Sequence, residues 1–119
     1  MGVNTRAKGE LGERIAEAFL VLKGYDILEK NLRYAGREID ILARDRGALV
    51  AVEVKLRRGG RFGKAVEAVD GRKLARVRLA LEGVAAAGGT RLIPRIDVVA
   101  IDFEDDMSSM VVNHLESVY

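Results

Sequence analysis

Three carboxylates and one lysine are the residues of this sequence that point to a chemical function. Asp40 lies in one aliphatic run, Glu53 and Lys55 lie in the next, and Glu13 lies upstream in a segment with helical periodicity. A strand seldom carries charges in its middle without a use for them, because burying an unpaired charge is costly. Carboxylate oxygens are the ligands that hard divalent ions such as Mg²⁺ prefer. The question is therefore whether the fold brings these carboxylates together.

Two strands joined by a tight turn would bring Asp40 close to Glu53. Residues 38–43 and 49–55 are rich in β-branched and aliphatic side chains, and the segment 45–48 has a central Arg-Gly pair that suits a two-residue hairpin loop. With that loop, counting back along both strands places Asp40 directly opposite Glu53. Their Cβ atoms would be about 4.5–5.5 Å apart.

A cation is expected beside these carboxylates. Two like charges at such a distance destabilise a sheet unless a cation lies between them or one carboxylate is protonated. Lys55 shares the face of Glu53 because side chains alternate along a strand. The prediction is a pair of metal ligands, Asp40 and Glu53, with an ammonium beside them. The alternative is an ordinary cross-strand ion pair in which Lys55 balances one acid on a solvated face.

Aliphatic residues are predicted on both faces of the hairpin. One buried face is predicted for Ile39, Ile41, Val52 and Val54. Among the charges on the other face we expect Leu42, Leu49 and Ala51. The charged face is therefore not a simple solvated surface, which favours the metal pair over the ion pair.

Length and composition predict one domain that spans residues 1–119. The chain has 119 residues, 49% of them hydrophobic, which is enough for one core but not for two. The absence of Cys excludes disulfides, thiolate metal sites and a cysteine nucleophile. Residues 1–10 are polar and no apolar stretch is long enough to span a bilayer, so we expect no membrane association and a cytoplasmic protein.

Basic residues are concentrated directly after Glu53. The net charge is only +2, but residues 55–78 contain nine basic and two acidic residues. The basic ones are Lys55, Arg57, Arg58, Arg61, Lys64, Arg72, Lys73, Arg76 and Arg78, and the acidic ones are Glu67 and Asp70. This run predicts a phosphate-binding rim, with a solvated loop and helix face as the alternative. An acidic group, Asp102, Glu104, Asp105 and Asp106, is expected in a solvated turn.

The order of elements follows from periodicity and from stop signals. The predicted helices are residues 5–23 and residues 71–87, the second capped by Asp70 and ended by Gly88-Gly89. Around the hairpin, the predicted strands are 25–33, 96–103 and a short edge strand at 110–114. Because a helix precedes residues 96–103, this strand is expected to lie parallel to residues 49–55.

This order, with acids on the second and third strands, resembles the restriction-endonuclease-like nucleases of the PD-(D/E)xK superfamily. Asp40 would be the first acid, and Glu53-Val54-Lys55 would be the (D/E)xK element. More closely, the chain resembles the YraN-like family of small bacterial proteins, and its order of charged residues is similar to that of archaeal Holliday-junction resolvases. The matching segments are 9–13, 24–28, 31–33, 38–43, 52–55, Lys73 and 95–99.

The resemblance implies an α/β fold with a restriction-endonuclease-like αβββαβ core, in which a mixed sheet is flanked by helices. It also implies a Mg²⁺- or Mn²⁺-dependent site that cleaves phosphodiester bonds in DNA. Asp40, Glu53 and Glu13 would ligate the metal, and Lys55 would act on the attacking water and on the developing charge. Arg57, Arg58, Arg61 and Lys73 would contact nucleic acid.

Two functions stay open on these grounds, a nuclease acting on branched or flapped DNA and a nucleic-acid-binding module that keeps the fold without catalysis. Glu10 is close enough to replace Glu13, and Glu38 is expected to pair with Arg37 or Lys55. Lys73 is expected in solvent if it does not contact phosphate, and the single histidine, at position 114, is given no catalytic role. The edge strand at 110–114 leads us to expect a homodimer.

Overall fold

A five-stranded mixed sheet organises the chain in the computed structural model, which describes residues 5–59, 63–106 and 108–118. The helices are α1 (Thr5–Leu22), α2 (Lys64–Glu67) and α3 (Gly71–Gly88). The strands are β1 (Asp26–Tyr34), β2 (Arg37–Asp45), β3 (Ala48–Arg58), β4 (Ile93–Phe103) and β5 (Met110–Leu115), in the spatial order β1-β2-β3-β4-β5. The predicted α/β class with a mixed, helix-flanked sheet is confirmed, and it is compatible with a restriction-endonuclease-like core. The short helix α2 was not predicted.

The β2–β3 hairpin has the register that its turn dictates. Asp45 pairs with Ala48, and the antiparallel ladder continues to the pair Ile41 and Val52. Arg46 has φ +54°, the left-handed conformation that two-residue hairpin loops require. On the other side of β3, β4 runs parallel to it along its whole length, as the intervening helices require.

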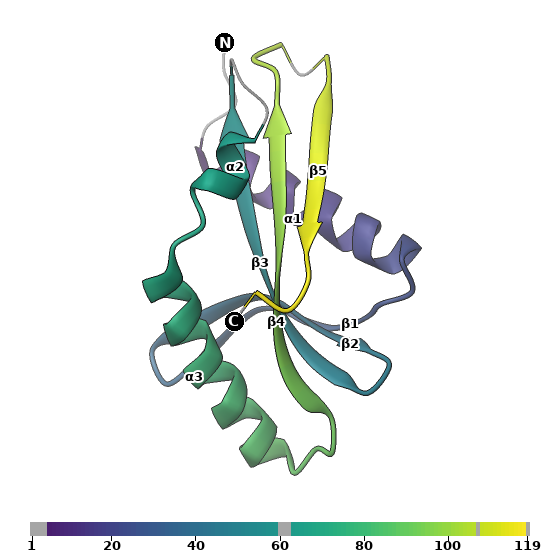
Figure 1. Cartoon of the computed structure of the whole chain (residues 1–119), viewed down its shortest axis with the longest axis vertical. Coiled ribbons are helices and arrows are strands. Elements are labelled where there is room, and N and C mark those ends of the chain that lie inside the picture. The colour runs from purple at the N-terminus through teal and green to yellow at the C-terminus, as the bar shows by residue number, and fades with distance from the viewer. Residues whose placement is uncertain (1–4, 60–62, 107, 119) are drawn as a thin grey trace.

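Helices cover the two faces of the sheet separately (Figure 1). Ala16 and Leu20 of α1 pack on one face, and Leu74 and Leu81 of α3 pack on the other. The sheet residues buried beneath α1 include Ile41, Ala43, Val50, Val52, Val99 and Ile101. Those buried beneath α3 include Leu42, Leu49, Ala51, Ile96, Val98 and Ala100. Burial of both faces explains why β3 and β4 read as nearly continuous apolar runs.

One predicted face assignment is wrong. Ile39 belongs to the cluster beneath α3, whereas Ile41 belongs to the cluster beneath α1. The reason is that the regular β2–β3 ladder ends at the pair Ile41 and Val52, so strict alternation does not extend back to Ile39. Asp40 lies at this end of the regular ladder.

The acidic group near the end of β4 is only in part the solvated turn that was predicted, because Asp105 and Asp106 are exposed in a turn but Asp102 is buried. Asp102 is 2% exposed, and its carboxylate accepts hydrogen bonds from the backbone N–H groups of Gly63 (3.1 Å) and Ala65 (2.9 Å). These donors lie at the start of α2, where backbone N–H groups lack partners within the helix. Asp102 therefore fixes α2 against β4, while Glu104 and Asp105 are less buried.

The predicted boundaries of α3 agree with its local caps. Asp70 accepts a hydrogen bond from the backbone N–H of Arg72 (2.9 Å), and Gly89 ends the helix with φ +63°. Within the described part of the chain, no helix is long and apolar enough to cross a bilayer.

Candidate active site

Asp40 and Glu53 meet where the β2–β3 ladder ends. The backbone N–H of Val54 donates a hydrogen bond to Asp40 Oδ2 (2.9 Å), which holds this carboxylate against β3. Glu53 is the neighbouring residue on β3, and it is 5% exposed. The fold thus gathers the two predicted acids, although by a side-chain-to-backbone hydrogen bond beyond the last regular ladder pair.

Burial and mutual repulsion make this pair hard to ionise fully. Burial and the charge of Asp40 raise the pKa of Glu53 to about 7. Burial also raises the pKa of Asp40, against the opposing effects of the Val54 hydrogen bond and of Lys73. Near neutral pH the two carboxyl groups can therefore share a proton, and both favour a nearby cation.

The cation beside Glu53 is Lys73 of α3. Its ammonium pairs with Glu53 Oε1, and no other donor among the described residues reaches the two buried Glu53 oxygens. Burial alone would lower the pKa of Lys73, but Glu53, Asp40 and Glu38 outweigh it and raise the pKa. Lys73 is thus bound into the site, whereas the sequence suggested a solvated or phosphate-contacting side chain.

A helical spacing could have revealed this position of Lys73. It precedes Val77 by four residues and Leu81 by eight, and both are buried against the sheet. Residues three or four apart share a face of a helix. A lysine in line with the apolar stripe of α3 therefore has to point toward the sheet in the first turn.

Lys55 lies near Glu53 but does not pair with it. No carboxylate in the described ranges is within ion-pair distance of Lys55, yet Lys55, Glu53 and Lys73 line one small cavity together with Asp70. Burial and the charges of Arg57 and Lys73 lower the pKa of Lys55. The shared cavity agrees with the prediction that Lys55 lies on the same side of the sheet as Glu53. The alternative, in which Lys55 forms an ion pair with one of the acids, does not agree with the structure.

Glu13 stands apart from the two central acids. Its side chain faces Asn31 of β1, whose amide nitrogen donates to the Glu13 carboxylate (3.2 and 3.3 Å) in the amide orientation that satisfies both groups. Burial and the charge of Asp40 raise the pKa of Glu13, so the two groups influence each other. Among the described residues, however, no three His, Cys, Asp or Glu side chains are close enough to hold one ion.

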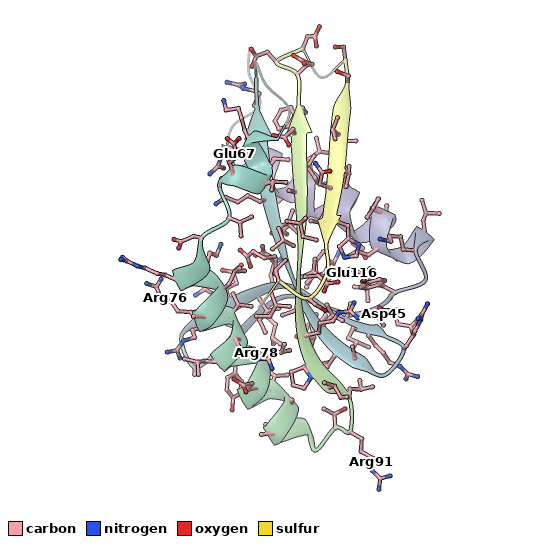
Figure 2. The ribbon with its side chains drawn as sticks, viewed as in Figure 1. Asp45, Glu67, Arg76, Arg78, Arg91 and Glu116 are labelled. Atoms are coloured by element: carbon pink, nitrogen blue, oxygen red, sulfur yellow. The ribbon has the colours of Figure 1, made fainter. Side chains whose placement is uncertain are left out.

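An open pocket of about 370 Å³ lies beside Asp40. Glu38, Asp40, Asp70, Lys73 and Arg76 supply its charged lining, together with Arg37. Figure 2 shows Arg76 on the N-terminal half of α3. The pocket places basic groups next to Asp40, an arrangement that suits a phosphate group beside a metal ion.

The structure brings only some residues of the predicted basic rim close to the candidate site. Arg58 pairs with Asp105 (3.3 Å), and Arg57 donates to the carbonyl of Leu56 (2.8 Å). Both side chains are exposed at the end of β3, so they remain accessible, whereas Arg61 lies outside the described residues. Glu38 pairs with Arg33 of β1 (3.6 Å), which corrects the partners predicted for it.

The donor set at Asp40 and Glu53 fits Mg²⁺ or Mn²⁺. The buried Glu53 and the partly buried Asp40 offer hard oxygen ligands, and the Glu53 oxygens have no donor among the described residues except Lys73. Mg²⁺ commonly uses one or two protein carboxylates and completes its shell with water and substrate phosphate. Asp40 and Glu53 would therefore hold the ion, without a third carboxylate from the described part of the chain.

A second buried polar cluster was not recognised in the sequence. Asp97 of β4 is fully buried and accepts from Arg95 Nε (3.0 Å) and from the Tyr25 hydroxyl (2.8 Å), while His114 Nε2 lies 2.9 Å from it. Arg95 also pairs with Asp45 in the β2–β3 turn (2.9 Å), near the segment that carries Glu116 (Figure 2). The cluster ties the C-terminal segment to the sheet, which gives the single histidine a structural position.

Comparison with known proteins assigns the chain to a family. Residues 12–101 match the model of the uncharacterised protein family UPF0102, a segment that contains Glu13, Asp40, Glu53, Lys55 and Lys73. The chain belongs to the UPF0102 family. This confirms the predicted YraN-like relationship, and the family's description assigns it no activity.

Curated UPF0102 proteins match over most of their length. The one from Symbiobacterium thermophilum is 44% identical over 99 residues, which cover 82% of this chain and 84% of that protein. Those from Corynebacterium efficiens and Kineococcus radiotolerans are 40% and 46% identical, and they cover 92% and 83% of this chain and 89% and 85% of their own lengths.

Proposed function

We propose that this UPF0102 protein is a metal-dependent nuclease that hydrolyses phosphodiester bonds in DNA, with branched or flapped structures as its substrates. The observation that supports the proposal most strongly is that the partly buried Asp40 lies beside the buried Glu53, whose two carboxylate oxygens have no partner among the described residues except Lys73. Placing a buried and a partly buried carboxylate side by side costs stability, so a fold that does so has a use for them. Binding of Mg²⁺ or Mn²⁺ is that use.

Each residue of the site has a part in the proposed reaction. A bound ion would polarise the scissile phosphate and lower the pKa of a coordinated water. Asp40 and Glu53 would hold it, and Glu13 would add negative charge from α1. Lys55, beside Glu53 and without an acid partner among the described residues, would orient the attacking water and stabilise the charge that develops on phosphorus oxygens.

The open pocket beside Asp40 supplies the place for the DNA strand. Its basic lining residues, Arg37, Lys73 and Arg76, would contact phosphates next to the cleaved bond. The exposed Arg57 and Arg58 would extend this contact along β3, and the proposal also includes Arg61. Such contacts position the DNA backbone without recognising the base sequence, which agrees with a substrate recognised by its shape.

The test is cleavage of a panel of branched, flapped, single-stranded and duplex DNAs in Mg²⁺ or Mn²⁺. We expect the wild type to cleave at least one branched structure, and Asp40→Asn and Glu53→Gln to abolish cleavage. The lysine variant Lys55→Ala should be strongly impaired. Cleavage that persists undiminished in Asp40→Asn would show that a contaminating nuclease or another site is responsible.

A non-catalytic nucleic-acid-binding module is the second candidate. It is favoured by the separation of Glu13 from Asp40 and Glu53, because no group of three acids forms within the described ranges. Such a module would bind branched DNA without cutting it, and Asp40→Asn would leave the affinity unchanged in the presence of metal. Binding assays on the same DNA panel distinguish the two functions.

A further inference from the structure

Lys73 separates two spaces of the candidate site. On one side it lines the open pocket that contains Asp40 and Arg76. On the other side it lines the small cavity that contains Glu53 and Lys55. The side chain therefore lies between the space that is open to a DNA strand and Glu53, which is the more deeply buried of the two central carboxylates.

The Lys73 ammonium also occupies the place that a metal ion needs. It pairs with Glu53 Oε1, and the Glu53 side chain is only 6% exposed. No other donor among the described residues reaches either oxygen of Glu53. An ion bound by Asp40 and Glu53 would compete with this ammonium, because two cations at contact distance from one carboxylate repel each other.

The position of Lys73 is held by these carboxylates and not by its helix. It lies in the first turn of α3, where the partial positive charge of the helix N-terminus disfavours a cation. Its side chain is 50% exposed, so it can turn outward without opening the apolar core. Loss of the pairing with Glu53 would release Lys73 toward the open pocket.

We propose that Lys73 is a positioning residue that holds the metal's place in the metal-free protein and moves to a DNA phosphate when the ion binds, so that metal and DNA bind cooperatively. This inference rests on the proposed function and adds a regulation to its site. A DNA phosphate in the open pocket attracts the ammonium, which vacates Glu53 for the ion. By thermodynamic linkage, the ion in turn strengthens the binding of DNA by the same factor.

The first test measures Mg²⁺ binding to the metal-free protein by calorimetry at pH 8, where Glu53 is mostly ionised. We expect Lys73→Met to bind Mg²⁺ about tenfold more tightly than the wild type, a typical size for such couplings. The matched control is Arg76→Met, which removes the same charge from the same helix and pocket but no contact with Glu53. It should change the affinity much less, and Lys73→Arg should stay close to the wild type.

The outcomes separate this inference from the nuclease proposal. Equal Mg²⁺ affinity in the wild type and Lys73→Met would overturn the inference and leave the metal site in place. An equal gain in Arg76→Met would overturn it as well, since the effect would then be one of general charge. If none of the variants binds Mg²⁺ or Mn²⁺, the metal site itself is wrong, and the role of Lys73 is wrong with it.

The second test measures cooperativity directly. Ca²⁺ binding is titrated with and without a short branched DNA, whose integrity is checked on a gel after each titration. In the wild type we expect the DNA to raise the affinity for Ca²⁺ about tenfold. In Lys73→Met and in a second neutral variant, Lys73→Gln, this enhancement should largely disappear. An enhancement that stays the same in both variants would contradict the proposed movement of Lys73.

Discussion

Replacement of Glu53 by Gln should stabilise the metal-free protein at alkaline pH and have little effect at acidic pH. The pKa of Glu53 is raised from its ordinary value of 4.5 to about 7, first by burial and then by the charge of Asp40. Between these values the folded state keeps a proton that the unfolded state releases. The free energy of unfolding therefore falls as the pH rises through this window, and the full cost is present above about pH 7.

The size of the effect follows from the shift. Each pKa unit corresponds to 1.36 kcal/mol, so ionised Glu53 costs about 3 kcal/mol in the folded protein. The side chain is almost fully buried, so solvent screening does not greatly reduce this figure. Gln carries no charge, and Lys73, which is half exposed, can be hydrated when its partner is lost. The variant should thus exceed the wild type by up to about 3 kcal/mol at pH 8 and by little at pH 5.

Urea denaturation at a series of pH values, at low salt and with a chelator present, measures this difference. The control is Glu29→Gln on β1, where the carboxylate is exposed. It should follow the wild-type pH dependence. If Glu53→Gln shows the same pH dependence as the wild type, Glu53 is not the buried, proton-retaining group that we describe. Saturating Mg²⁺ should remove most of the difference, because the ion compensates the same charge.

The remaining predictions concern the metal, the chemistry, the binding surface and the second polar cluster. Thermal melting should show that Mg²⁺ or Mn²⁺ stabilises the wild type and not Asp40→Asn, because only the native state presents the paired ligands. An equal rise in melting temperature for the two proteins would show that Asp40 does not bind the metal. Lys55→Ala should leave the affinity for branched DNA within a few-fold and lower single-turnover cleavage by about 10²-fold or more, the scale expected for an electrostatic or acid–base group; unchanged cleavage would refute its role. Neutralising Arg57 and Arg58 together should weaken DNA binding across sequences and flatten its salt dependence, measured by fluorescence anisotropy in a salt series. Asp97→Ala should cost about 3–5 kcal/mol in urea denaturation, because it removes the buried carboxylate that Tyr25, Arg95 and His114 all contact and leaves these polar groups without it. Burial alone would raise the pKa of Asp97, but the hydrogen bonds from Arg95, His114 and Tyr25 outweigh burial and lower the pKa below its ordinary value of 3.8. The stability that ionised Asp97 contributes should therefore be present above pH 3.8 and be lost as the pH falls through the lowered pKa.

Local chemistry explains what could be predicted of the fold. The Arg-Gly turn sets the pairing of Asp45 with Ala48, and the whole regular ladder of the hairpin follows from it. Asp70 and Gly89 mark the ends of α3 through caps that involve only neighbouring residues. The approach of Asp40 to Glu53 is a consequence of the same turn, so the central acids of the candidate site were accessible from sequence.

The sequence by itself determined the elements other than α2, the hairpin register and the two central acids, because each depends on periodicity or on contacts only a few residues apart. The tertiary structure decided which charges neutralise each other. Lys73 reaches Glu53 only because α3 crosses the sheet at β3, and Asp97 and Asp102 are buried only because distant segments bring donors to them. The helical spacing of Lys73 could indicate that it points toward the sheet, but it could not assign its partner. Charges act through space over several ångströms with no fixed sequence spacing, so the choice of Lys73 over Lys55 as the partner of Glu53 depends on the tertiary structure.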